Sequence, residues 1–120
     1  MGQLKAKRER VIYNFTKYIN RSIKPMNDQL LTRNINSIGR SCFIKHFELL
    51  TNQELSTKQI TEKLIVLEGY SENGARTRVN CTKRILKLNC IERALDMVID
   101  TKKISNDIKL KAEQIKIHYL

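Results

Sequence analysis

Apolar residues recur along almost the whole chain at the spacing of one face of an α-helix. The first such stripe falls between residues 4 and 20 and consists of Val11, Ile12, Phe15, Tyr18 and Ile19. Apolar and polar residues nowhere alternate for more than a few positions, which half-buried strands would require. The pattern therefore predicts helices from end to end.

After Pro25, the same spacing predicts a short helix over residues 28–33 and a longer one over residues 37–50. The longer helix turns one set of apolar residues inward, namely Ile38, Cys42, Phe43, Phe47 and Leu50. Two more stripes predict two C-terminal helices. The first stripe is Ile91, Ala94, Leu95, Val98 and Ile99, and the second, after Ser105, is Ile108, Ala112, Ile115 and Tyr119.

Local start and stop signals are clearest between residues 56 and 89. Ser56 and Gln59 have the spacing of a capping box, and Gly69 is a suitable left-handed C-cap for the helix between them. That helix is expected to carry Ile60, Leu64 and Leu67, and Tyr70 is expected to pack back on the core. Ser71 is the N-cap candidate of a further helix that reaches about residue 89.

These elements fit one domain, because 120 residues are enough for one core without disulfide or metal staples. We expect an all-α, single compact domain of five or six helices over residues 1–120. A basic amphipathic helix within residues 1–24 comes first, residues 37–89 form the central unit, and residues 90–120 form the C-terminal helices.

The charge of the chain is strongly positive and unevenly distributed. It has 23 Lys and Arg against 12 Asp and Glu, a formal net charge of +11. Residues 1–24 hold seven basic residues and one acid, and residues 73–88 hold five basic residues and no acid. Residues 48–72 and residues 89–100 each carry more acids than bases. Such a surplus is typical of proteins with a polyanionic partner, most often nucleic acid.

The second basic block has two different faces when placed on a helical wheel of about 100° per residue. Ala75, Val79, Thr82 and Leu86 form a core face. The opposite face is polar or basic throughout, with Asn73, Arg76, Thr77, Asn80, Arg84 and Lys87. Arg and Asn pair with guanine and adenine edges in the major groove, and Lys and Thr reach phosphates.

Residues 56–64, the turn at residues 69–71 and residues 75–86 together resemble a helix-turn-helix, with residues 38–50 as the preceding helix of a trihelical core. The stretch at residues 65–69 is longer than in the compact form, as winged-helix relatives allow. Those relatives would add a vestigial wing, although the residues after Leu88 read as helix.

This resemblance implies a non-enzymatic, double-stranded DNA-binding protein whose helix at residues 72–88 enters the major groove. It implies a transcription regulator, or an accessory factor in replication or segregation. The implied base-reading residues are Asn73, Arg76, Thr77 and Asn80. The implied phosphate contacts are Ser56, Thr57, Lys58, Ser71, Lys83, Arg84 and Lys87, with further contacts from Lys5, Lys7, Arg8 and Arg10.

Two other functions fit the charge. The first is an interaction adapter whose basic faces bind an acidic protein. The second is RNA binding, which the low aromatic content (6%) disfavours because single-stranded RNA is usually held by stacking. The apolar stripe of residues 11–19 is more typical of a core or a dimer interface than of a membrane anchor.

Catalytic and metal-binding motifs are sparse. His46 and His118 have no triad or metal spacing, and no glycine loop for phosphates occurs, so we expect no enzyme, no cofactor and no small-molecule ligand. Cys42, Cys81 and Cys90 are expected to be free buried thiols. The alternative is a zinc site made by these three residues and His46.

Location and assembly follow from what the apolar residues can do. No apolar run approaches the ~18 residues of a membrane span, and the first residues are charged, so a cytoplasmic, nucleoid-associated protein is expected. Leu110 and Ile117 lie on a second side of the last predicted helix. With the stripe at residues 11–19, they predict a homodimer through the terminal helices.

Overall fold

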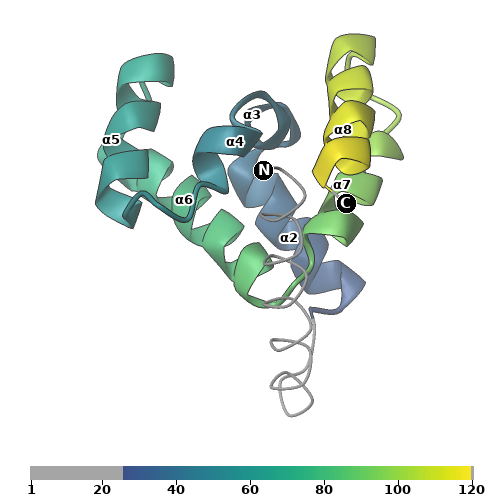
Figure 1. Ribbon diagram of the computed structural model, residues 1–120, viewed down its shortest axis with the longest axis horizontal. Helices are drawn as coiled ribbons and strands as arrows, with labels where there is room; N and C mark the ends of the chain where they lie inside the picture. Colours follow the sequence, from purple (N-terminus) through teal and green to yellow (C-terminus); the bar gives the residue numbers. More distant parts are fainter. Residues whose placement is uncertain (1–25, 120) are drawn as a thin grey trace, which may run out of the picture.

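The computed structural model describes residues 26–119, and this part of the chain is all-α, as predicted (Figure 1). Its seven helices exceed the five or six expected for the whole chain. They are α2 (Asp28–Ile38), α3 (Arg40–Lys45), α4 (Phe47–Leu50), α5 (Thr57–Glu68), α6 (Glu72–Lys87), α7 (Ile91–Ile99) and α8 (Asn106–Tyr119). The N-terminal helix predicted within residues 1–24 lies outside the described residues.

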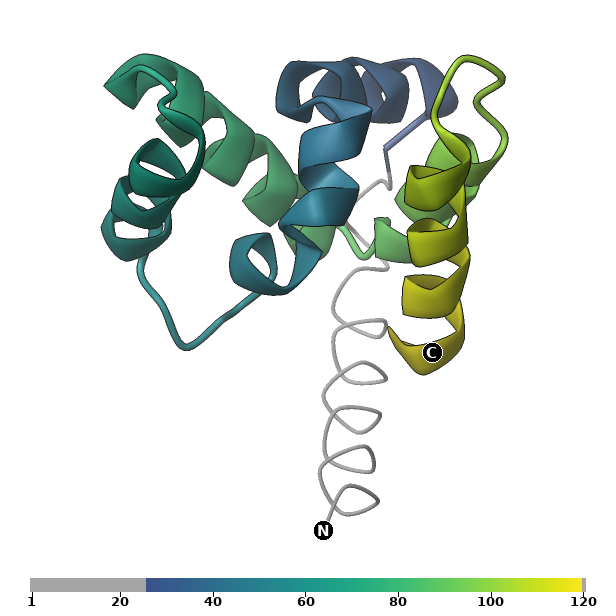
Figure 2. The same cartoon turned by 90° about the horizontal axis from the view of Figure 1, so that it is seen from above.

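The helices form one globule around a continuous core. α2 and α6 lie side by side, and α5 packs along another side of α6 (Figures 1 and 2). At the other end of the molecule, α8 packs on α7 and α3. The helix lying along α6 is therefore α2, which begins before the expected unit at residues 37–89.

The predicted helix over residues 37–50 is wrong, because Gly39 and His46 divide it. Gly39 has φ +88° and ψ 126°, a conformation that L side chains rarely adopt, and it separates α2 from α3. His46 (φ −111°, ψ 25°) separates α3 from α4. Phe43, Ile44 and Leu50, which lie after the first break, are all completely buried. The helix predicted over residues 28–33 instead continues to residue 38.

The predicted caps of α5 and α6 are confirmed. Ser56 Oγ accepts the Gln59 N–H at 3.1 Å, and Gln59 Oε1 accepts the Ser56 N–H at 2.8 Å, a complete capping box. Gly69 ends α5 in the left-handed conformation (φ +71°). Ser71 Oγ then accepts the Gly74 N–H at 3.0 Å and starts α6. The turn between the two helices is thus fixed by local hydrogen bonds at each end.

Some inward positions differ from the prediction. Leu67 was expected to face the core but is 59% exposed. Tyr119 is 46% exposed, yet its ring packs edge-to-face on the core residue Phe47, with 5.5 Å between the ring centroids. On α6, Ala75, Val79 and Thr82 are buried as expected, and Tyr70 is half-buried against the core. Leu86 was assigned to the core face but is only half-buried. Ile85 and Cys81, which were assigned to neither face, are buried, because α2 packs along α6.

A vestigial wing is not present among residues 26–119, which contain no strand. Residues 91–99, where a wing would begin, form α7. The three cysteines are free and buried, as predicted. None of the described helices has the length and apolar character needed to cross a membrane.

Candidate nucleic-acid interface

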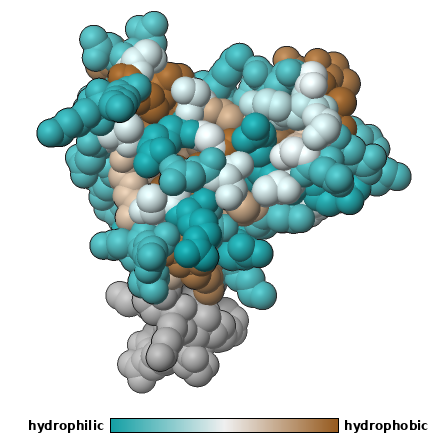
Figure 3. All heavy atoms as spheres, turned by 180° about the vertical axis from the view of Figure 1, so that it is seen from behind, coloured by the Kyte–Doolittle hydropathy of each residue, from teal (hydrophilic) through white to brown (hydrophobic). Residues whose placement is uncertain are grey.

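The outer face of α6, defined as the side opposite its buried residues, is exposed. All six residues that the wheel assigned to this face are exposed, namely Asn73, Arg76, Thr77, Asn80, Arg84 and Lys87. Hydrophilic residues cover most of the side of the molecule on which α2 and α6 lie, and the strongly hydrophobic ones gather at its margins (Figure 3). A polar helix face of this kind is accessible to a large partner.

Two arginines of the outer face have partners within the chain. Arg76 forms an ion pair with Glu72, one turn earlier, at 2.5 Å between Nη2 and Oε1. Arg84 Nη1 donates to Asn34 Oδ1 of α2 at 3.3 Å. The Arg76 pair is at the surface, where such contacts contribute little free energy, so an incoming anion can replace it, whereas the Arg84 contact reaches buried Asn34. Within residues 26–119, neither Arg84 nor Lys87 forms an ion pair.

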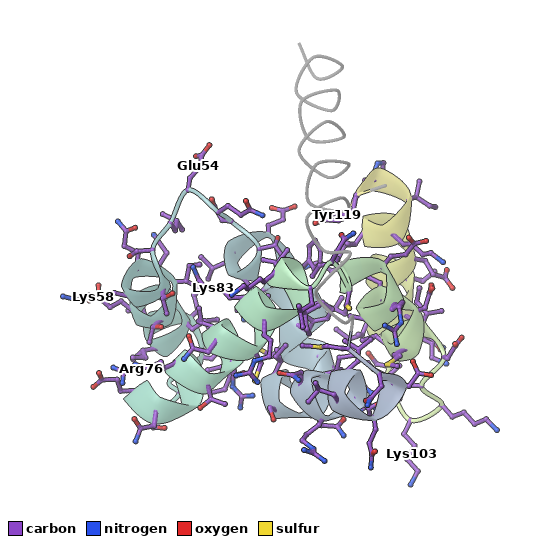
Figure 4. The ribbon with its side chains drawn as sticks, turned by 90° about the horizontal axis from the view of Figure 1, so that it is seen from below. Glu54, Lys58, Arg76, Lys83, Lys103 and Tyr119 are labelled. Atoms are coloured by element: carbon purple, nitrogen blue, oxygen red, sulfur yellow. The ribbon has the colours of Figure 1, made fainter. Side chains whose placement is uncertain are left out.

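The start of α5 lies next to this face. A groove between the two helices is lined by Thr57, Lys58 and Thr61 of α5 and by Glu72 and Arg76 of α6. Lys58 and Arg76 project at the same end of the molecule (Figure 4). A predicted phosphate contact, Lys58, and a predicted base-reading residue, Arg76, are therefore brought together, but Glu62 and Glu72 line the same groove and reduce its positive potential.

The other predicted phosphate contacts are placed less uniformly. The hydroxyls of Ser56 and Ser71 accept cap hydrogen bonds, and each still has its O–H to donate. Thr57 and Lys83 are partly buried, so Lys83 lies at the margin of the outer face rather than within it. Lys5, Lys7, Arg8 and Arg10 lie outside the described residues.

Arg78 has a role that the sequence analysis missed. It turns away from the outer face, and its Nη1 donates to the carbonyl oxygens of Ser37 at 3.2 Å and Ile38 at 2.5 Å. Its guanidinium lies over the Tyr70 ring, 4.1 Å from the centroid. Arg78 therefore joins α6 to the C-terminal carbonyls of α2 and to the turn before α6.

Tyr70, Cys42 and Arg78 form a small cluster, in which Tyr70 is a neutral partner. Burial, followed by a hydrogen bond with Cys42, raises the pKa of Tyr70 to about 12. Burial also raises the pKa of the Cys42 thiol. Both groups are therefore protonated near neutral pH, so the charge of the cluster comes from Arg78.

The end of α5 is held by a second polar cluster. Glu68 Oε1 accepts a hydrogen bond from Lys45 Nζ at 2.8 Å and lies 3.4 Å from His46 Nε2. The hydrogen bond from Lys45, followed by the nearby His46 imidazole, lowers the pKa of the Glu68 carboxyl. These contacts connect the C-terminal end of α5 to α3 and to the break before α4.

The zinc alternative finds no geometric support in residues 26–119, where no three His, Cys, Asp or Glu side chains gather as metal ligands would. Cys42 and His46 instead contact Tyr70 and Glu68, respectively. His46 and His118 belong to no triad-like cluster among the described ion pairs and hydrogen bonds.

No protein-family model, curated protein sequence or solved structure matches this chain. The geometry of α6 and its neighbours therefore carries the functional conclusion.

Proposed function

We propose that the protein binds double-stranded DNA and that the outer face of α6 lies in the major groove. The observation that supports this most directly is the exposure of all six polar or basic residues on one side of a helix 16 residues long. Its other side is anchored by completely buried Ala75, Val79 and Ile85, so the helix presents that face rigidly. A helix of this length spans about 24 Å, enough to cross a major groove about 12 Å wide.

In this arrangement the residues divide into two roles. Asn73, Arg76, Thr77 and Asn80, near the N-terminal half of α6, contact base edges. Lys87 and Arg84, nearer its C-terminal end, contact phosphates, and Lys58 contacts a phosphate from the start of α5. Arg76 exchanges its surface ion pair with Glu72 for a base contact. A role in transcription regulation, replication or segregation of a genetic element follows as the proposed context.

Fluorescence anisotropy with a labelled duplex tests the proposal. Affinity is expected to fall linearly with salt on a log–log scale, and about six phosphate contacts would give a ~1000-fold loss between 50 and 200 mM salt. Asn80→Ala is expected to cost about 1–3 kcal/mol and to relax preference at one base pair of a selected site. Lys87→Ala is expected to weaken all sequences similarly. Lys63→Ala, which removes an exposed charge of α5, is the matched control and should change little.

Competitors distinguish the other functions. Single-stranded RNA that displaces the duplex at equal concentration would favour RNA binding. Polyglutamate that binds as tightly as duplex would favour an adapter for acidic proteins. Duplex affinity that does not depend on salt, or an Asn80→Ala variant with unchanged sequence discrimination, would refute the proposed interface.

We also propose that the DNA-bound form is a homodimer joined through α8. One recognition helix contacts few base pairs, so it gives little sequence specificity. A two-fold symmetric dimer doubles the number of base pairs contacted, because it binds two inverted half-sites about 10 base pairs apart. Leu110 and Ile117, two turns apart on α8, are 58% and 74% exposed. Light scattering is expected to give a dimer that the pair of substitutions Leu110→Glu and Ile117→Glu dissociates. A monomer at hundreds of micromolar, with and without DNA, would exclude this assembly.

A further inference from the structure

A second groove lies where α2 ends and α3 begins, outside the proposed interface. Its volume is about 420 Å³, and it opens between the α2–α3 junction, the turn before α6 and the loop before α8. Its cationic side chains come from three different segments, Arg40 of α3, Arg78 of α6 and Lys103 of the α7–α8 loop. No carboxylate lines it. Three like charges that line one groove without an acid give it a positive potential, which favours an anion.

The three cations of this groove also lack ion-pair partners. Arg76, Arg93, Lys45 and Lys116 each pair with a carboxylate, but within residues 26–119 no ion pair includes Arg40, Arg78 or Lys103. The contacts of Arg40 are with neutral groups, since its Nε donates to Thr101 Oγ1 at 2.9 Å and its Nη1 to Asn36 Oδ1 at 2.5 Å. These contacts orient the guanidinium without neutralising it.

Arg78 provides a second, independent observation. Its Nη1 is fixed by two carbonyl groups and its plane by the Tyr70 ring, yet its buried Nε has no hydrogen-bond partner in the described part of the chain. A buried cationic donor without a partner is costly, because it has lost its hydration without replacement. The exposed hydroxyl of Ser41 lines the same groove and adds a neutral donor.

We infer that this groove binds a phosphate group through Arg40, Arg78 and Lys103. Planar guanidinium groups match the oxygens of a phosphate, and Lys103 adds a mobile point charge. If the proposed function holds, on which this assignment rests, the group is a backbone phosphate of the bound duplex. Lys103 projects at the opposite end of the molecule from Lys58 (Figure 4), so the two sites would contact the duplex at separate places.

The loop before α8 offers a matched pair of variants for the test. Lys102 and Lys103 are adjacent and both exposed, but only Lys103 lines the groove. With the full chain and a duplex of about 20 base pairs or more, Lys103→Gln is expected to lower affinity about fivefold. It should also reduce the slope of log affinity against log salt by about 0.9, the loss of one phosphate contact. Lys102→Gln should change neither quantity.

Inorganic pyrophosphate, titrated at constant ionic strength, separates the groove from the duplex. NMR amide shifts are expected at residues 39–42 and 101–104 in the wild type and in Lys102→Gln, but not in Lys103→Gln. If Lys102→Gln and Lys103→Gln bind the duplex with equal affinity and equal salt dependence, while the outer-face variants still lose affinity, the groove is not a duplex contact. The proposed function would then remain intact. Pyrophosphate binding at the groove in a protein that binds no duplex would assign the site to free phosphate and refute the proposed function. Absence of shifts at both segments would overturn the site.

Discussion

Two arginines that lie two residues apart on α6 should contribute very unequally to stability, although their sequence surroundings are similar. Arg76 lies on the outer face and pairs only with Glu72. Arg78 bonds two carbonyl groups of α2 and stacks on Tyr70. Methionine is a suitable replacement at both positions, because it keeps an unbranched side chain and a similar helix propensity while removing the charge and the donors.

The expected cost follows from the contacts that each substitution removes. For Arg78→Met, the short bond to the Ile38 carbonyl contributes about 1.5–2 kcal/mol and the longer bond to Ser37 about 0.5 kcal/mol. Stacking on Tyr70 contributes about 0.5–1 kcal/mol. The sum is about 3 kcal/mol, a large part of the stability of a domain of this size. Arg76→Met removes one surface pair between residues one turn apart, worth about 0.3–0.5 kcal/mol.

Urea unfolding followed by circular dichroism measures both variants. With an m-value near 2 kcal/mol/M, Arg78→Met should lower the unfolding midpoint by about 1.5 M, and Arg76→Met by less than about 0.3 M. A double-mutant cycle with Tyr70→Leu should give a coupling energy of about 0.5–1 kcal/mol to Arg78 and none to Arg76. Equal midpoints for the two arginine variants would refute the assignment of Arg78 as the link between α6 and α2.

Three further outcomes follow from backbone geometry and pKa. Gly39→Ala should destabilise the protein by about 2–3 kcal/mol, because the φ of +88° at this position is unfavourable for alanine. Gly69→Ala should cost only about 1 kcal/mol, because Gly69 has left-handed helical geometry with open space around it. Thermal unfolding of the two variants compares these costs. Because folding raises the pKa of Tyr70 to about 12, it favours the protonated phenol, and the stability of the protein should fall as the pH rises from 10 toward 12. Unfolding at several alkaline pH values tests this, and the fall should be smaller in Tyr70→Phe. The pKa of Glu68 is lowered, so the stabilisation that its carboxylate provides is present above pH 4.5 and should be lost as the pH falls below that value. Unfolding measured along an acid titration should show a smaller loss of stability in Glu68→Gln.

The parts of the fold that the sequence predicted correctly are fixed by contacts within a few residues. The Ser56 cap, the Gly69 stop and the Ser71 cap each depend on hydrogen bonds or backbone angles inside one turn. The exposure of the outer face of α6 was also predictable, because helical periodicity separates Arg76 and Asn80 from buried Val79. Such features do not require knowledge of which helix packs where.

The features that the sequence analysis missed depend on distant parts of the chain. Arg78 contacts carbonyls 40 and 41 residues earlier, and only the packing of α2 along α6 brings them within reach. A signal was present, since the wheel places Arg78 about 60° from Ala75, closer to the core than to the outer face. Gly39 could equally have lain inside a helix, at a cost of about 1 kcal/mol. Its positive φ ends the helix, and local spacing does not specify that conformation.

The three buried thiols make the opening of separate regions chemically measurable. Cys42 lies in α3, Cys81 in α6, and Cys90 at the start of α7, with 8%, 8% and 1% of their surfaces exposed. An alkylating reagent reacts with the thiolate, so each thiol is protected until its own segment moves away from the core. The rate of adduct formation at each position, resolved by mass spectrometry, therefore reports the free energy of a local opening without any engineered label. Helices that separate individually give three different rates, whereas a domain that opens only as a whole gives a single one.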